Sequence, residues 1–162
     1  MSQMRKVVSN TTSIIALSEI GRLNLLKDLF SKIYIPQAVF DEIKNEPAYT
    51  MVRDNRDWIE IVDINADQDI MKMYKSKLHA GEVESIVLAQ SIGADLIILD
   101  DYAARKTAQY LGLCITGTMG VLIKAKQEGL IDRVKPLIEG LIGHGLFISD
   151  RVKQEILSIA GE

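Results

Sequence analysis

The sequence predicts an α/β protein in which helices cover a mostly parallel sheet. Short runs rich in β-branched residues alternate along the chain with segments whose apolar residues recur at helical spacing. The run at residues 94–99 contains four consecutive large aliphatic residues, which is typical of a parallel strand buried on both faces. The 162 residues, 48% apolar and 25% charged, have the length and composition of one globular domain. We therefore expect a single core.

The first predicted strand occupies residues 7–9, and a helix follows it directly. Thr11, Thr12 or Ser13 can cap this helix, because hydroxyl side chains accept hydrogen bonds from the free N–H groups of a first turn. Its apolar residues share one face, and Gly21 is a typical helix end. The sequence thus predicts a strand, a polar turn and an amphipathic helix at the start of the chain.

Two further strands and two helices are predicted before residue 65. Residues 23–30 have the pattern of a helix, and residues 31–35 alternate as a strand. Pro36 opens the next helix, since a first helical turn tolerates a residue without an N–H, and Pro47 ends it. Residues 58–64 predict a strand at an edge of the sheet, because charged residues interrupt them.

Glycines end several of the elements predicted in the second half of the chain. Gly93, Gly112 and Gly129 each follow a helical pattern, as expected for a helix C-terminus. In chain order, the predicted elements are helices at 67–77 and 81–93, a strand at 94–99, a helix at 103–111, a strand at 113–116, a helix at 117–128, a helix from 134, a short strand at 146–148 and a helix from 150.

Composition and charge exclude several classes of protein. The net charge of −3 and pI near 5.5 argue against a broadly basic, non-specific binder of nucleic acid. No apolar run approaches the ~20 residues of a membrane span, and the N-terminus lacks the pattern of a secretory signal. Cys114 is the single cysteine, so no internal disulfide is possible. We expect a cytoplasmic protein that makes no membrane contact.

Polar side chains follow the predicted strands, where parallel sheets bind ligands. Asn10 follows the first strand, and Asp100 and Asp101 follow the most apolar one. Glu42 and Glu82 lie near helix ends. Each has a structural alternative: Asn10 as a helix cap, Glu82 as a partner of the helix dipole, and Glu42 as a solvated residue. The adjacent acids are harder to explain in this way, because like charges repel and one acid would suffice as a cap.

Two known classes of α/β protein that bind or transfer phosphate do not match the residues after the first strand. A phosphatase or phospho-receiver protein needs an aspartate after the first strand, and Asn10 cannot form an acyl phosphate. A nucleotide-binding P-loop or Rossmann protein needs a glycine-rich loop there, and the residues after Ser9 contain none. His79 precedes a glycine-containing helix start, and we assign it to the polar surface.

Several segments in order resemble the PIN-domain nucleases, over residues 7–131. They are closest to an uncharacterised prokaryotic branch, domain of unknown function 3368, related to the VapC toxins. The segments are VVSNTTSIIALSEIGRLNLL from residue 7, IPQAVFDEI from 35, HAGEVESIVLAQSIGADLIILDD from 79, AARKTAQYLGL from 103 and TGTMGVLIKAKQEGLI from 116. The resemblance implies a three-layer α/β/α sandwich with about five mostly parallel strands. It also implies that residues 1–162 form one domain, with a helical extension from about residue 132.

The resemblance also implies a nuclease site that binds Mg²⁺ or Mn²⁺ and hydrolyses single-stranded RNA, or less often single-stranded DNA. The four family positions fall on Asn10, Glu42, Glu82 and Asp101, with Asp100 as the competing alignment for the last. Carboxylates are needed there because a divalent ion must neutralise the phosphodiester and activate a water molecule. The polar positions that accompany them fall on Thr11, Thr12, Ser13 and Thr118.

Basic residues near this site are candidates for phosphate contacts. Arg105 lies four residues after Asp101, about one helical turn, and Lys106, Lys124 and Lys126 are further candidates. An equally simple interpretation is that Arg105 only pairs with Asp101. Relatives in the family further imply a homo-oligomer, a homodimer or larger, and a small antitoxin-like partner.

Asn10 stands at the position where the family ordinarily has an acid. An amide oxygen still ligates a hard cation but lacks the charge that attracts one, so we expect weaker metal binding than with Asp. One ion held by Glu82 and Asp101, with Asp100, Asn10 and Glu42 nearby, would then support slow hydrolysis. The competing hypothesis is a catalytically weakened PIN module that binds nucleic acid or a protein partner without cleaving.

Overall fold

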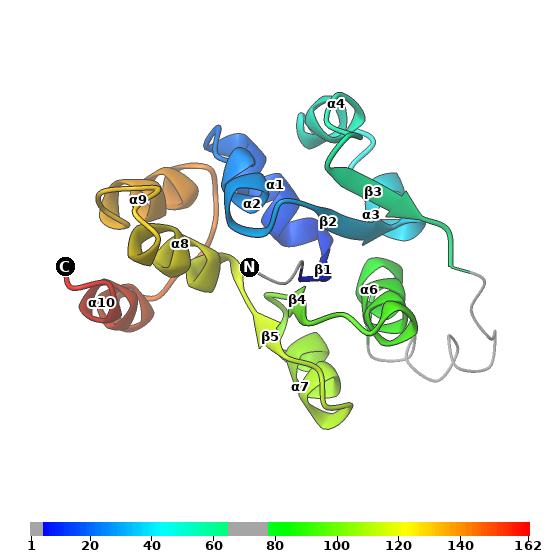
Figure 1. Ribbon diagram of the computed structural model, residues 1–162. Helices are drawn as coiled ribbons and strands as arrows, with labels where there is room; N and C mark the ends of the chain where they lie inside the picture. The colour runs from blue at the N-terminus through cyan, green and yellow to red at the C-terminus, as the bar shows by residue number, and fades with distance from the viewer. Residues whose placement is uncertain (1–4, 65–77) are drawn as a thin grey trace.

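A five-stranded parallel sheet forms the centre of the part of the chain that the structure describes (Figure 1). This structure, a computed structural model, describes residues 5–64 and 78–162. The strands lie in the order β3-β2-β1-β4-β5 and each pairs in parallel with its neighbours. Their bounds are β1 (Val7–Ser9), β2 (Ile33–Pro36), β3 (Ile59–Val62), β4 (Leu96–Ile98) and β5 (Ile115–Thr116). The predicted α/β class and the edge position of the third strand are confirmed.

The strand order reverses between β1 and β4. From β1 the chain moves outward to β2 and β3, then crosses to β4 on the other side of β1 and continues to β5. All of β1 is buried, with Val8 opposite Tyr34 on one side and Ile97 on the other. β1 rather than β4 is therefore the middle strand, although β4 has the longer aliphatic run.

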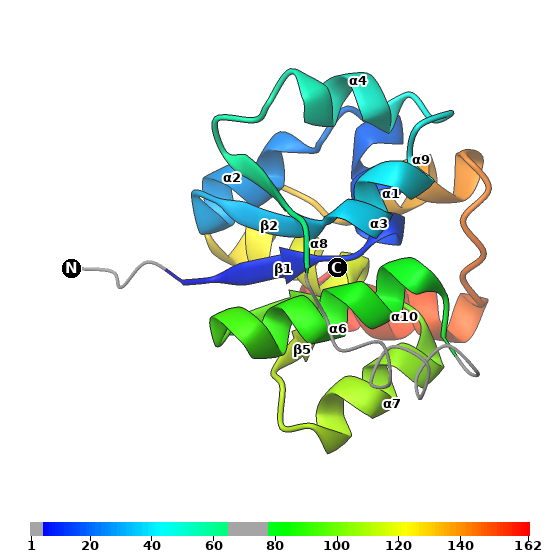
Figure 2. The same cartoon turned by 90° about the vertical axis from the view of Figure 1, so that its right-hand side faces the viewer.

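Helices cover both faces of the sheet, as the two perpendicular views show (Figures 1 and 2). One face carries α6 (Ala80–Ile92) and α7 (Tyr102–Tyr110). The other carries α1 (Thr11–Glu19), α2 (Asn24–Phe30), α4 (Ala48–Arg53), α8 (Thr118–Gln127), α9 (Lys135–Gly143) and α10 (Asp150–Ile159). Because side chains alternate along a strand, Val7 belongs to the core of the second face and Val8 to that of the first. The three-layer arrangement is confirmed.

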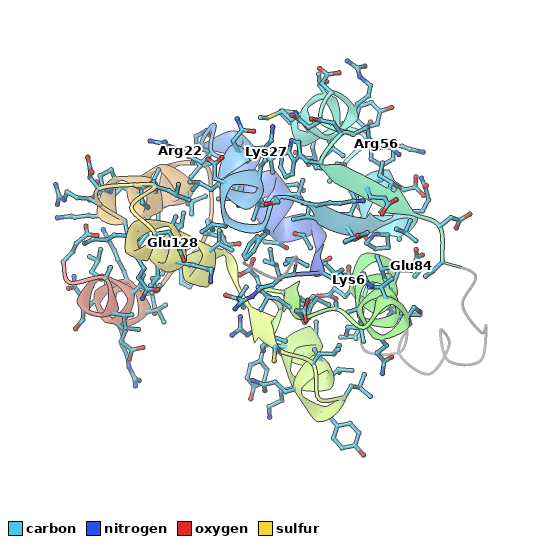
Figure 3. The ribbon with its side chains drawn as sticks, viewed as in Figure 1. Lys6, Arg22, Lys27, Arg56, Glu84 and Glu128 are labelled. Carbon is cyan, nitrogen blue, oxygen red and sulfur yellow. The ribbon has the colours of Figure 1, made fainter. Side chains whose placement is uncertain are left out.

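One short helix joins the two layers at the carboxyl edge of the sheet. This helix, α3 (Gln37–Glu42), packs against α6 on one side and α1 on the other. Glu84 of α6, labelled in Figure 3, accepts a hydrogen bond from the backbone N–H of Ala38 at 3.2 Å. The first turn of α3 is thereby held close to the beginning of α6.

Two predictions about local structure are wrong, and one lies outside the described residues. α3 ends at Glu42, and Pro47 instead precedes α4, a helix that the sequence reading missed. Residues 146–148 form no strand, because no strand of the described residues pairs with them; Leu146 and Ile148 pack against the larger core instead. The helix predicted at 67–77 lies outside the residues that the structure describes.

None of the helices within residues 5–64 and 78–162 combines the length and the apolar character that crossing a bilayer requires.

Candidate active site

The residues predicted after the strands meet where the strand order reverses. Asn10 directly follows β1, and Asp100 and Asp101 follow β4 after one intervening residue. The backbone N–H of Asn10 donates to the carbonyl of Ile98 at 3.1 Å, which fixes the end of β1 against the end of β4. Parallel open sheets bind ligands at this kind of position.

Glu82 and Asp101 form the centre of the candidate site. Glu82 stands in the first turn of α6, is only 6% exposed, and accepts a hydrogen bond from the backbone N–H of His79 at 3.0 Å. Asp101 caps α7 by accepting from the N–H of Ala104 at 3.0 Å. Burial and the adjacent carboxyl group of Asp101 raise the pKa of Glu82 above its usual value, against the opposing effect of the His79 N–H. The two acids therefore lie close enough to repel each other when both are charged.

Glu42 lines the same pocket as Glu82 but is already engaged by the protein. One carboxylate oxygen accepts the backbone N–H of Gly81 at 2.8 Å, and the other accepts the hydroxyl of Thr11. A Cβ on Gly81 would stand 2.6 Å from the Glu42 carboxylate, so only glycine permits this approach. Glu42 therefore ties the end of α3 to the starts of α6 and α1.

The structure separates the two adjacent aspartates. Asp100 turns to the start of α8, where one of its oxygens accepts the backbone N–H of Thr118 at 2.8 Å and the other accepts the hydroxyl of the same residue. The Thr118 hydroxyl also lies 2.7 Å from that of Ser13, and both of these residues are buried. Asp101, rather than Asp100, is the acid that lies beside Glu82.

Among the predicted phosphate-binding cations, Arg105 lies at this edge. The Arg105 guanidinium donates to the Leu99 carbonyl at 3.0 Å and flanks Gly117 together with Asp100. Within the described residues no ion pair joins Arg105 to Asp101, so the simple pairing interpretation is wrong. Lys124 lies six residues after Thr118 on α8, about 9 Å further along the helix.

An open pocket of about 530 Å³ lies over Asn10 and Glu82. The side-chain oxygen of Asn10 is buried without a hydrogen-bond partner among the described residues, a costly state for an amide. The residues lining the pocket are Asn10, Thr11, Thr12, Glu42, His79, Ala80 and Glu82. His79 therefore lines the pocket and does not belong to the general polar surface. Its position three residues before Glu82 is the feature of the sequence that could have indicated this.

The donors present suit a hard divalent cation, although the acids do not form a closed cage. Across the described ranges, no three His, Cys, Asp or Glu side chains form a group able to hold a metal ion. The neighbouring donors are two carboxylates, Glu82 and Asp101, with the partnerless amide oxygen of Asn10 beside them. Mg²⁺ in proteins takes one or two carboxylates and keeps several waters, so this set fits an ion that remains largely hydrated.

Comparison with known protein families agrees with this geometry. A model of the DUF3368 family, described as a PIN domain, matches residues 6–162. A comparison with curated proteins found no match. The match includes the whole sheet, the four candidate acids, the Asn10 amide and the C-terminal helices. The chain therefore belongs to the DUF3368 family of PIN domains, which have a nuclease-type fold.

Proposed function

We propose that this PIN domain is a Mg²⁺- or Mn²⁺-dependent endoribonuclease that hydrolyses phosphodiester bonds in single-stranded RNA. The observation that carries the proposal is the pair of close carboxyl groups, Glu82 and Asp101, beside the partnerless amide oxygen of Asn10. A folded protein does not ordinarily keep a buried carboxyl group, here Glu82, beside a second acid and an unpaired buried amide. A cation between them would satisfy all three groups.

Each residue of the site has a distinct part in this proposal. Glu82, Asp101 and Asn10 would hold the ion, which when bound neutralises a phosphodiester and lowers the pKa of a coordinated water towards ~7. Thr12 is exposed, lines the pocket and stands in the first turn of α1, where hydroxyl and N–H groups favour a phosphate. Glu42 and Asp100 act as positioning residues, because their oxygens are committed to Gly81, Thr11 and Thr118.

Cleavage of end-labelled single-stranded RNA tests the proposal. We expect cleavage by the purified protein in Mn²⁺ or Mg²⁺, none in EDTA, and none by Asp101→Asn or Glu82→Gln. A matched control is Asp95→Asn, an acid at the opposite end of β4 that binds the Lys6 N–H at 2.7 Å. Metal-dependent cleavage that persists in both site variants would contradict the assignment of the site.

The second candidate function is a PIN module that grips RNA or a protein partner without cleaving it. Two observations favour it: Asn10 brings no charge to its position, and both oxygens of Glu42 are occupied by hydrogen bonds. RNA binding with no cleavage in any divalent metal would support this function over the nuclease. Weak cleavage that Asn10→Asp strongly accelerates would indicate a function intermediate between the nuclease and the non-cleaving module.

The family resemblance also motivates proposals about biological context. We propose that the protein works in the cytoplasm as a homo-oligomer and is the toxin of a toxin-antitoxin pair, neutralised by a small antitoxin-like protein at the acidic edge. Growth arrest on expression, relieved by the product of a neighbouring reading frame, is the expected result. Unimpaired growth under expression of a protein that cleaves RNA in vitro would contradict the toxin role.

A further inference from the structure

We propose that the outer face of α7 is a track for single-stranded RNA that leads away from the acidic site. On this track Tyr102 and Tyr110 would stack with bases, and Lys106 would contact the phosphate backbone. The inference rests on the proposed ribonuclease function and adds to it a binding surface outside the pocket.

The position of α7 connects this face to the site. α7 begins directly after Asp101, so that Tyr102 is the next residue along the chain from an acid of the central pair. The helix packs inward on α6 and β5 through residues such as Ala104 and Ala108. Among the described residues, Figure 1 shows α7 as the outermost element of its layer, with no helix beyond it. No described element therefore covers its outer face, which can take a ligand that has one end in the site.

Two strongly exposed aromatic side chains lie along this outer face. Tyr102 is 71% exposed and Tyr110 is 90% exposed. They stand at positions i and i+8 of one helix with Lys106 at i+4, so the three side chains follow one stripe. The Lys106 ammonium lies 4.9 Å from the centre of the Tyr102 ring, a cation–π contact that orders both groups at the surface.

The charge of α7 differs from that of the chain as a whole. The protein carries a net charge of −3, whereas α7 contains Arg105 and Lys106 and no acidic residue. Arg105 turns inward to the Leu99 carbonyl, which leaves Lys106 as the cation of the exposed stripe. A polyanion with aromatic bases matches this combination better than an acidic peptide does, because both the tyrosines and the lysine find a partner.

The length of the stripe fits several nucleotides. Eight residues of helix separate Tyr102 from Tyr110, a distance of about 12 Å along the axis. Successive stacked bases are ~3.4 Å apart along a strand, so the stripe spans about three or four nucleotides. Stacking on tyrosine is tolerant of base identity, and we therefore expect the track to add affinity without adding sequence specificity.

Steady-state cleavage of two RNA lengths by the full-length protein tests the track. The substrates are a twelve-nucleotide oligouridylate and a trinucleotide that is too short to reach Tyr110. For Tyr102→Ala and for Tyr110→Ala, we expect KM for the long RNA to rise on the order of tenfold with kcat unchanged. For Tyr110→Ala, KM for the trinucleotide should stay at the wild-type value.

Three controls separate stacking from loss of structure. Tyr102→Phe and Tyr110→Phe keep the ring and should retain wild-type KM. Phe147→Ala removes a side chain that is 91% exposed on the other side of the sheet, between α9 and α10, and should leave KM unchanged. Thermal unfolding should be the same for every variant, because the altered side chains are exposed.

The outcomes distinguish this inference from the proposed function. Wild-type protein that cleaves RNA, with KM unaltered in both tyrosine-to-alanine variants, would refute the track and leave the nuclease intact. Protein that neither cleaves RNA nor binds labelled oligouridylate in EDTA would refute both. Equal losses in the tyrosine and Phe147→Ala variants would show general surface adhesion and overturn the track.

Discussion

The carboxylate of Glu42, at the end of α3, accepts the backbone N–H of Gly81 at 2.8 Å in the first turn of α6. This bond joins residues 39 positions apart and holds the start of α6 at the carboxyl edge of the sheet. The position of Glu82 beside Asp101 depends on it. Several predictions concern the consequences of this arrangement.

Gly81→Ala should destabilise the protein and abolish RNA cleavage. Its Cβ would stand 2.6 Å from the Glu42 carboxylate, so α3 and α6 must separate or Glu42 must give up its hydrogen bonds. Overpacking of this kind costs about 1–3 kcal/mol, measurable by urea unfolding. The matched control is Gly143→Ala, at the end of α9, where an added Cβ meets nothing within 4 Å. Equal stabilities for the two variants would refute the close-approach role of Gly81.

Glu82→Gln should stabilise the metal-free protein at neutral pH while abolishing its response to metal. The raised pKa of Glu82 means that the folded state favours the protonated acid, so wild-type stability falls as the pH rises from 4.5 through the folded pKa. Glutamine removes this repulsion and still accepts the His79 N–H. Thermal unfolding in EDTA at pH 7 should show a higher Tm for the variant, and Mn²⁺ should raise the Tm of the wild type alone. A lower Tm for the variant in EDTA would contradict the repulsion between Glu82 and Asp101.

The two adjacent aspartates should give opposite phenotypes. Asp100→Asn weakens the cap of α8 at Thr118, and we expect it to cost about 1–3 kcal/mol of unfolding free energy with Mn²⁺ affinity retained. Asp101→Asn still offers an oxygen to the Ala104 N–H, so it should lower Mn²⁺ affinity with little effect on folding. Calorimetric Mn²⁺ titration and urea unfolding of both variants provide the check. If Asp100→Asn were the one to lose Mn²⁺ binding, the assignment of the two acids would be reversed.

Asn10→Asp should tighten Mn²⁺ binding. The new carboxylate would replace a partnerless amide oxygen beside Glu82 and add the charge that attracts a hard cation. The same variant should be less stable than wild type in EDTA, because it adds a third negative charge to the edge. Calorimetry that finds equal Mn²⁺ affinities for the variant and the wild type would count against Asn10 as a ligand.

Glu162→Gln should lower stability at neutral pH, and the difference should vanish in strong acid. The backbone N–H of Val134, that of Lys135 and the Lys126 ammonium hold the pKa of the Glu162 carboxyl at about 2, well below its usual value. A depressed pKa stabilises the fold above the unfolded value of 4.5, and that contribution is lost as the pH falls towards 2. Urea unfolding at pH 7 and near pH 2 measures it. A difference that is constant over this range would rule out the charged carboxylate as its source.

The α/β architecture and the placement of Asn10 and Asp101 at one edge of the sheet could be predicted from local sequence. β-branched runs predict strands, and the carboxyl ends of parallel strands share one edge of the sheet. The short helix α4 was missed because Pro47 was interpreted as a helix end, although it stands just before a helix. Residues 146–148 have the apolar character of a strand, and whether such a run pairs depends on neighbours that local sequence does not contain.

The finer geometry of the site depends on long-range contacts that no local pattern encodes. Ser13 meets Thr118 across 105 residues, and Asp100 rather than Asp101 accepts the N–H and the hydroxyl of the same threonine. Glu42 was identified as a candidate ligand by family resemblance, whereas the structure shows both of its oxygens bound to neighbouring elements. Which backbone N–H or hydroxyl reaches a given carboxylate depends on the folded chain, and local sequence does not contain this information.

The central claim is that Glu82 and Asp101 together bind a divalent cation for RNA cleavage. Its most direct test is the initial rate of single-stranded RNA cleavage in Mn²⁺ for the wild type, Glu82→Gln, Asp101→Asn and the double variant, each with an EDTA control. We predict Mn²⁺-dependent cleavage by the wild type only, with each single variant as inactive as the double variant. Cleavage by the double variant at the wild-type rate, or cleavage by the wild type that persists in EDTA, would contradict the claim.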